Sequence, residues 1–194
     1  MARRCLPYEL ASDSGHVIDT VPQTAYISGE PQAVVQLYFG NAPKGSVLIK
    51  KIDSVTRAPL SDVRFFVTDS SGAVIGNVNG YYTTDSAGAI LIENLDPGLT
   101  VIAKETAAKA GYVLDDTPQT AKVLSGETVT LEFRNAPKGG LIVQKFDSVT
   151  KTPLAGAEFR ITTASGELVP DNEGLTSSNG LYTTNAQEIG RAHV

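Results

Sequence analysis

The stretch SVLIKKIDSVTRAPL, from Ser46 to Leu60, decides the fold because it returns as GLIVQKFDSVTKTPL from Gly140. The sequence before each copy repeats as well: GHVIDTVPQTAYISGEPQAVVQLYFGNAPKG begins at Gly15, and GYVLDDTPQTAKVLSGETVTLEFRNAPKG begins at Gly111. The NAPKG and K-x-D-S-V-T motifs both recur after 94 positions (135 − 41 and 145 − 51). The chain is therefore built from repeats of about one hundred residues.

This period divides the chain into one complete repeat and two incomplete ones. Residues 6–44 hold the C-terminal part of a first repeat, residues 45–138 a complete second repeat, and residues 139–187 the N-terminal half of a third. Residues 1–5 match no other part of the chain and are interpreted as a leader of doubtful origin. Residues 188–194, EIGRAHV, abandon the strand expected from the second repeat and are interpreted as a non-native tail.

Apolar and polar residues alternate along the second repeat. The alternating segments are VLIKKID, VRFFVTD, AILIENL, TVIAKET, TAKVL and TVTLEFRN, and turn signals such as DSAG, DPG and SGE lie between them. A period of two is typical of strands that bury one face, and about seven such strands form a sandwich. We therefore expect an all-β chain of tandem Ig-like β-sandwich domains, one complete and two partial.

Composition and charge exclude several classes of function. The chain has 18 Gly and 10 Pro, a net charge of −5 and no apolar run long enough to cross a bilayer. Scattered basic residues and net negative charge argue against nucleic acid and against membrane insertion. Cys5 is the single cysteine, so no disulfide can form within the chain and any covalent staple must be of another kind.

Three polar residues occupy inward positions of the expected strands in the second repeat. Lys51 follows an apolar alternation in the first strand, Glu105 does so in a middle strand, and Asn135 does so in the last. The incomplete repeats carry counterparts at the same places: Glu9 and Asn41 in the first repeat, and Lys145 in the third. The repetition argues that these placements are not accidental.

An amine, a carboxyl and an amide in one apolar core suggest a chemical reaction. Burial favours the uncharged forms of an amine and a carboxyl, which creates a nucleophile and a proton donor beside an amide carbon. Attack of the amine on the Asn side chain, with loss of ammonia, would form an isopeptide bond. The alternative is a structural ion pair between Lys51 and Glu105, with Asn135 capping a strand end.

The motifs resemble those of the Cna B-type, or SpaA-like, isopeptide-forming domains of Gram-positive adhesins and pilins. The family's K-x-D, turn and P-L-x-G-A-x-F pattern is similar to KFDSVTKTPLAGAEF and, less closely, to KIDSVTRAPLSDVRF. Its E-T-x-A-P-x-G-Y stretch is similar to ETAAKAGYVLD, with Lys109 near the usual proline, and its terminal N-A-P corresponds to FRNAPKG. Ser61, Asp62 and Val63 replace the usual glycine and alanine after P-L.

The resemblance implies a prealbumin-like fold and assigns a role to each polar residue. Lys51 would be the nucleophile, Asn135 the electrophile and Glu105 the catalytic carboxyl. Glu9 with Asn41, and Lys145, would belong to triads whose other members lie outside this chain. The reaction consumes its own groups, so the resemblance implies a mechanically resistant structural module and not an enzyme.

Other candidate sites have less support in the sequence. His16 lies in a loop and His193 in the tail, and neither supports catalysis. Tyr81 and Tyr82 are candidates for stacking against a carbohydrate, which leaves a ligand-binding β-sandwich without a cross-link as the alternative function. Alternating tyrosines in a strand more often place one ring in the core and one on the surface.

No metal or cofactor is expected. Asp19, Asp115 and Asp116 lack the dense spacing of a calcium loop and are interpreted as turn residues. The resemblance implies an extracellular location at the bacterial cell surface or cell wall. The expected partners are neighbouring repeats of the same chain, joined by semi-rigid APKG linkers, and host surface or matrix molecules bound through a missing tip domain.

Overall fold

A computed structural model describes residues 3–30, 33–76, 79–169, 181–184 and 190–193. Every regular element in these residues is a β-strand, which confirms the all-β prediction. The strands are β1 (Arg3–Cys5), β2 (Ala25–Ile27), β3 (Gly45–Asp53), β4 (Arg64–Asp69), β5 (Tyr81–Thr83), β6 (Ala89–Leu95), β7 (Thr100–Ala107), β8 (Gln119–Lys122), β9 (Thr128–Asn135), β10 (Gly140–Val143), β11 (Glu158–Arg160), β12 (Leu181–Thr183) and β13 (Gly190–His193). Within the described residues, no helix is long and apolar enough to cross a membrane.

The chain divides into two compact units. The first holds Met1–Ile52, Pro59–Ala107 and Asp116–Phe133, and the second holds Asp53–Ala58, Ala108–Asp115 and Arg134–Val194. Two turn segments of the second repeat therefore group with the second unit.

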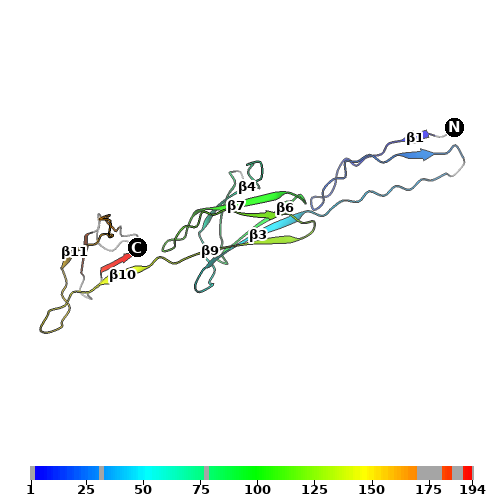
Figure 1. Cartoon of the computed structure of the whole chain (residues 1–194). Helices are drawn as coiled ribbons and strands as arrows, with labels where there is room; N and C mark the ends of the chain where they lie inside the picture. Colours follow the sequence, from blue (N-terminus) through cyan, green and yellow to red (C-terminus); the bar gives the residue numbers. More distant parts are fainter. Residues whose placement is uncertain (1–2, 31–32, 77–78, 170–180, 185–189, 194) are drawn as a thin grey trace. The chain divides into compact units, whose positions relative to one another are not determined.

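The second repeat forms two sheets whose inner faces make one core. One sheet has the strand order β6-β3-β9 and the other β5-β4-β7-β8, and Figure 1 shows β4 next to β7. The rings of Phe65 on β4 and Phe133 on β9 meet at 4.8 Å between centroids in an edge-to-face arrangement. Further core residues come from both sheets: Val47, Ile49, Val67, Ile90, Ile92, Val101, Ala103 and Leu131. The predicted β-sandwich is thus confirmed.

A tight turn follows β3 and recurs in the third repeat. Asp53 accepts hydrogen bonds from the backbone N–H groups two and three residues further on, at 2.6 and 2.9 Å. Arg57 then adopts a φ of 64°, which non-glycine residues rarely do. Asp147 and Lys151 repeat both features, with bonds of 2.8 and 2.7 Å and a φ of 57°. The D-S-V-T motif therefore encodes this turn.

The strand pair of the first repeat has the register of the complete domain. Cys5 on β1 pairs with Ala25 on β2, as Val101 on β7 pairs with Ala121 on β8. The spacing of 96 positions is the same for both members of the pair (101 − 5 and 121 − 25). The backbone of Arg3–Cys5 thus occupies a place in the repeat, although its sequence matches nothing else.

The end of the chain also keeps the repeat pattern in its backbone. Val143 on β10 pairs with Gly190 on β13, as Ile49 on β3 pairs with Ile90 on β6. The expectation that residues 188–194 abandon the strand is corrected here for Gly190–His193. Ladder hydrogen bonds are made by backbone groups, so strand pairing tolerates a sequence that has lost its apolar alternation. Residues 185–189 lie outside the described residues.

Candidate cross-linking site

Lys51 points into the core because of its place on β3. Along this strand the odd-numbered residues from Gly45 to Asp53 are buried, and Lys50 is exposed. Glu105 faces the core for the same reason, because it follows the buried residues Val101 and Ala103 at alternate positions of β7. The alternation that predicted both inward positions is therefore present in the structure.

Lys51 and Glu105 meet across the two sheets. Lys51 Nζ lies 2.6 Å from Glu105 Oε2, and both side chains are 0% exposed. A charged side chain without solvent is costly unless it is paired or neutralised. One proton can reside on either partner, so the contact fits both an ammonium–carboxylate pair and an amine–carboxylic acid pair.

Two aromatic rings flank the lysine amine. The Nζ atom of Lys51 lies 6.0 Å from the ring centroid of Phe65 and 5.8 Å from that of Phe133. Alternation along TVTLEFRN indicates that Phe133 faces inward, but no sequence pattern places either ring beside the amine. The sequence feature that marks Phe65 is the last position of the P-L-x-x-x-x-F segment. Its place beside the amine becomes evident only when β4 packs against β9.

Asn135 is the last residue of β9 and is 1% exposed, as its inward position predicted. In the sheet order, β9 is the hydrogen-bonded neighbour of β3, which carries Lys51. The backbone carbonyl of Asn135 accepts a hydrogen bond from the N–H of Ser54 at 2.9 Å, which fixes this strand end. The structure thus joins Lys51 to Glu105 and buries Asn135 at the end of the adjacent strand.

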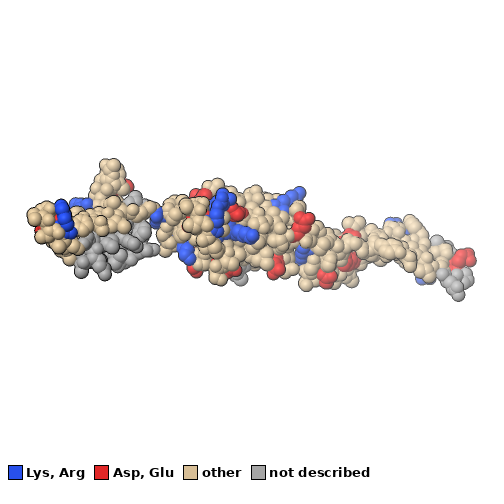
Figure 2. Space-filling view, turned by 90° about the horizontal axis from the view of Figure 1, so that it is seen from below, with Lys and Arg blue, Asp and Glu red and all other residues tan. Residues whose placement is uncertain are grey.

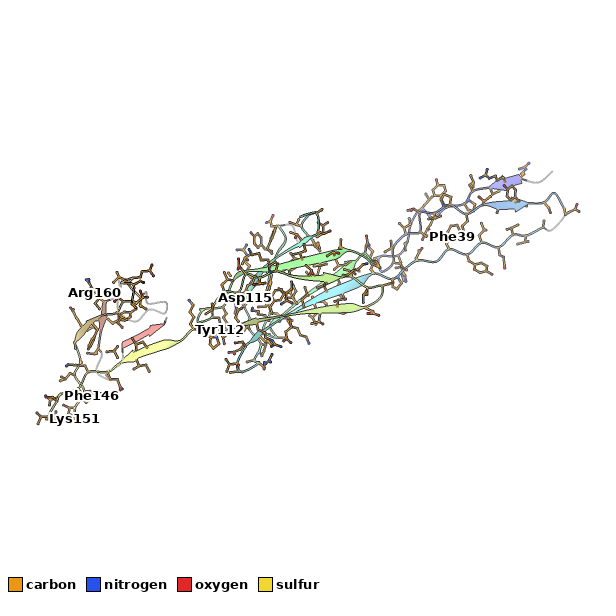
Figure 3. All side chains as sticks on the ribbon, viewed as in Figure 1. Phe39, Tyr112, Asp115, Phe146, Lys151 and Arg160 are labelled. Carbon is orange, nitrogen blue, oxygen red and sulfur yellow. The ribbon has the colours of Figure 1, made fainter. Side chains whose placement is uncertain are left out.

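A second polar pair lies at the same end of the repeat and was missed by the sequence analysis. Tyr112, labelled in Figure 3, donates a hydrogen bond from Oη to Asp53 Oδ2 at 2.9 Å. The backbone amides of Thr56 and Val55 hold the pKa of Asp53 below its usual value, and the bond to Asp53 raises the pKa of Tyr112. The sequence features that could have indicated this pair are the aspartate of the K-x-D motif and the tyrosine of the G-Y motif.

The first repeat brings its two predicted residues together. Asn41 Nδ2 donates to Glu9 Oε1 at 2.7 Å and to Ser12 Oγ at 3.0 Å. Glu9 Oε2 also accepts the backbone N–H of Asp19 at 2.8 Å. Oδ1 of Asn41 is buried, and no hydrogen-bond partner for it exists within the described part of the chain. A carboxyl and an amide are therefore adjacent here, and the contacts found for them within the described residues include no lysine.

Lys145 does not occupy the inward position that its sequence pattern predicted. Strand β10 ends at Val143, and Lys145 is exposed, as is Leu141 on the same expected face. The described third repeat contains no counterparts of β7 and β9, so no second sheet covers this residue. The local alternation is present in the sequence, but burial requires strands from the other half of the domain.

A protein-family model matches most of the chain. The model of the SpaA prealbumin-like fold domain matches residues 45–137 and again residues 139–193. The chain belongs to this family. The first matched segment includes Lys51, Glu105 and Asn135, and the second includes Lys145. No curated protein matches the chain.

Several solved structures are similar to this chain of SpaA domains. The TIE protein of Bacillus anthracis is 24% identical, with a TM-score of 0.45 and coverage of 90% of this chain and 30% of that one. A streptococcal ancillary pilin is 22% identical, with a TM-score of 0.47 and coverage of 95% and 60%. The major pilin BcpA of Bacillus cereus is 25% identical, with a TM-score of 0.46 and coverage of 54% and 32%. The chain thus spans less than two thirds of each of them.

The two tyrosines considered for carbohydrate stacking have contacts within the domain. Tyr82 is half-buried and donates from Oη to the carbonyl of Ile75 at 2.9 Å. Tyr81 is 39% exposed, with its ring 4.9 Å from that of Phe66 and 4.1 Å from the guanidinium carbon of Arg64. One ring therefore points inward and one outward, as alternation along a strand dictates.

The remaining polar candidates lie in local pairs on the surface. His16 Nδ1 is 2.8 Å from Asp13 Oδ1, and Asp116 Oδ2 is 3.0 Å from Lys104 Nζ. No group of three or more His, Cys, Asp or Glu that could hold a metal ion occurs among the residues described. Figure 2 shows basic and acidic side chains together on one face, with most of that surface uncharged.

Proposed function

We propose that this chain is a structural stalk module of a bacterial cell-surface protein, adhesin or pilin-like, whose second domain forms an intramolecular isopeptide bond between Lys51 and Asn135. The observation that carries the proposal is the 2.6 Å contact between Lys51 and Glu105 inside the core, where both side chains are 0% exposed. The domain modifies itself once and has no turnover, so it is not an enzyme.

The proposed reaction balances without a cofactor. The neutral amine of Lys51 attacks Cγ of Asn135, and Glu105 in its acid form donates a hydrogen bond to the amide oxygen. Glu105 then carries a proton from the attacking nitrogen to the leaving nitrogen, a new C–N bond forms, and ammonia departs. Neither a net charge nor an oxidation state changes, and the product is an uncharged amide in an apolar core.

The surroundings of the amine support this chemistry over a permanent ion pair. Phe65 and Phe133 flank Nζ, and Lys51 and Glu105 are both 0% exposed, so two separated charges would be costly in this site. The three groups are held by β-strands, so attack requires little further ordering. Formation of the product amide would also remove the buried ionisable amine of Lys51, and Glu105 would remain as a buried carboxyl.

The incomplete repeats support the same role in the parent protein. Glu9 already binds the amide of Asn41, and Oδ1 of Asn41 is buried without a partner in the described residues. We assign Glu9 and Asn41 to a second cross-linking site of the same kind and Lys145 to a third. The stalk would then carry one bond in each repeat.

The location of the parent protein follows from the same family. SpaA-like domains belong to adhesins and pilins of Gram-positive bacteria, so we place the parent protein outside the cell, at the cell wall. Its partners would be neighbouring repeats of the same kind, with host surface or matrix molecules bound elsewhere in the protein.

The intact mass of the chain tests the cross-link. The wild type is expected to be lighter than its sequence by one ammonia, with a branched peptide that joins Lys51 to Asn135 after digestion. The variant Glu105→Gln, which keeps the volume of the side chain, should have the full mass. Glu93→Gln, which changes an exposed carboxylate on β6, should remain cross-linked. A folded wild type of full mass would reduce Lys51 and Glu105 to a structural ion pair.

A further inference from the structure

The linker between the first and second repeats is bound by the repeat that precedes it. The carbonyl of Ala42 accepts the N–H of Val17 at 2.9 Å, and the N–H of Lys44 donates to the carbonyl of Gly15 at 2.8 Å. Between these bonds, Pro43 forms a bridge opposite His16. The linker thus continues as a short strand against the first repeat.

The second linker has the same contacts with its own preceding repeat. The carbonyl of Ala136 accepts the N–H of Val113 at 2.9 Å, and Lys138 donates its N–H to Gly111 at 2.8 Å. The contacts between each linker and the repeat before it are therefore made by the repeated motifs G-[HY]-V and A-P-K.

The first linker is also bound from the other side, by a turn of the repeat that follows. The carbonyl of Pro43 accepts two hydrogen bonds, from Ser125 Oγ at 3.0 Å and from the N–H of Gly126 at 3.2 Å. Next along the chain, the N–H of Ser46 donates to the carbonyl of Glu127 at 2.9 Å, and Ser46 Oγ lies 2.6 Å from the hydroxyl of Thr128. The turn of Ser125, Gly126 and Glu127 therefore contacts the linker at Pro43 and the start of β3 at Ser46.

Glycines on both sides allow this close approach. Gly126 has a φ of +69°, and a Cβ atom there would lie 3.3 Å from Cγ of Pro43. A Cβ atom on Gly45 would collide with the carbonyl of Leu124, in the same turn. Lys44 and Asp96 add an exposed ion pair at 3.7 Å, which contributes little at such distance and exposure. Specific backbone contacts, and not charge, hold the joint.

We infer that the Ser125–Glu127 turn is an interaction surface for the A-P-K-G linker of the preceding repeat, and that it makes the joint between repeats rigid. The carbonyls of Ala42 and Pro43 and the N–H of Lys44 all have hydrogen-bond partners, and Pro43 has no N–H that would need one. The tripeptide S-G-E recurs at Ser28–Glu30 in the first repeat, so the surface is a feature of the repeat. The inference does not depend on the cross-link.

Amide hydrogen exchange of the full chain, measured by NMR, tests the joint. The N–H of Gly126 reports the contact with Pro43, and the N–H of Leu60, which donates to Lys51 within the domain, reports global opening. Ser125→Ala is expected to accelerate exchange at Gly126 about three- to tenfold, the loss of one hydrogen bond, and to leave Leu60 unchanged. Ser71→Ala is the matched control, because it also precedes a glycine of positive φ in a turn but contacts no linker.

A second pair of variants tests the packing of the proline on the glycine. Gly126→Ala and Gly72→Ala both place a Cβ on a residue of positive φ, but only the first meets the linker, since nothing lies within 4 Å of a Cβ at Gly72. In the wild type and in Gly72→Ala, the residual dipolar couplings of Val17 and of β3 should fit a single alignment tensor, as expected for a rigid joint. In Gly126→Ala they should require two different alignment tensors. Unchanged exchange in Ser125→Ala, or one shared alignment in every variant, would overturn the inference.

Discussion

Replacing Asn135 by alanine separates a covalent bond from an ordinary buried contact. In the cross-linked domain, Asn135→Ala removes both the bond to Lys51 and the local contacts of the amide. In a Glu105→Gln background no bond forms, so the same replacement removes only the local contacts. The difference between the two losses of unfolding free energy is the contribution of the cross-link.

The sequence separation of the two residues sets the size of this difference. Lys51 and Asn135 are 84 positions apart (135 − 51). In the chain-entropy model, a covalent link that closes a loop of this length stabilises the folded state by about 4.5 kcal/mol. Loss of a buried amide costs about 1–3 kcal/mol in either background. Asn135→Ala should therefore cost about 6.5 kcal/mol in the wild type and about 2 kcal/mol in Glu105→Gln.

Urea unfolding of the full chain measures both losses, with the methyl signals of Val47 and Val67 as probes of the sandwich core. These residues lie on β3 and β4, so they report the second domain and not the incomplete repeats. Equal losses in the two backgrounds would refute the reasoning, because they would leave no energy that depends on the bond. A difference confined to the slope would indicate instead a change in the unfolded state.

Three further predictions concern the frame of the site. Asp53→Asn should make the stability of the domain less dependent on pH under acidic conditions. The pKa of Asp53 is lowered in the folded state, so its contribution to stability is complete above about pH 4, the unfolded pKa, and is lost as the pH falls through the folded pKa. An unchanged dependence of stability on pH would contradict this. Gly88→Ala should destabilise the domain more than Gly72→Ala and slow bond formation, because its Cβ would lie 2.5 Å from the carbonyl of Lys51, and equal urea midpoints would count against it. Tyr82→Phe should cost about 1 kcal/mol in urea unfolding by removing one hydrogen bond to a loop carbonyl, and no loss would show that water replaces it.

The fold and the inward direction of the site residues could be predicted because both depend on local patterns. Alternation along β3, β7 and β9 places Lys51, Glu105 and Asn135 on buried faces, and the structure has all three at 0–1% exposure. The repeat added independent instances of each placement. Which atoms meet was predictable only through the family resemblance, since alternation carries no information about the partner sheet.

The features that the sequence did not predict arise from contacts between distant segments. Phe65 reaches the lysine amine only because β4 packs against β9, and Tyr112 reaches Asp53 across 59 positions. Lys145 shows the converse, because it follows the correct local pattern but is exposed, and no strand of a second sheet covers it among the described residues. The contact of Ser125 with the carbonyl of Pro43 spans 82 positions and joins two repeats, which no pattern within one repeat encodes.

The positions of the site residues explain why such a site suits a load-bearing stalk. Lys51 lies on the first strand of the domain and Asn135 at the end of the last, so in the proposed stalk tension would enter and leave the domain beside these two residues. A bond between them would carry the load directly and leave β4 to β8 outside the force path. The linkers begin directly after Asn41 and Asn135, where backbone bonds of 2.8–2.9 Å fix them to the preceding repeat. Stiffness at the joint and a covalent bond within the domain would therefore act in series along one continuous path.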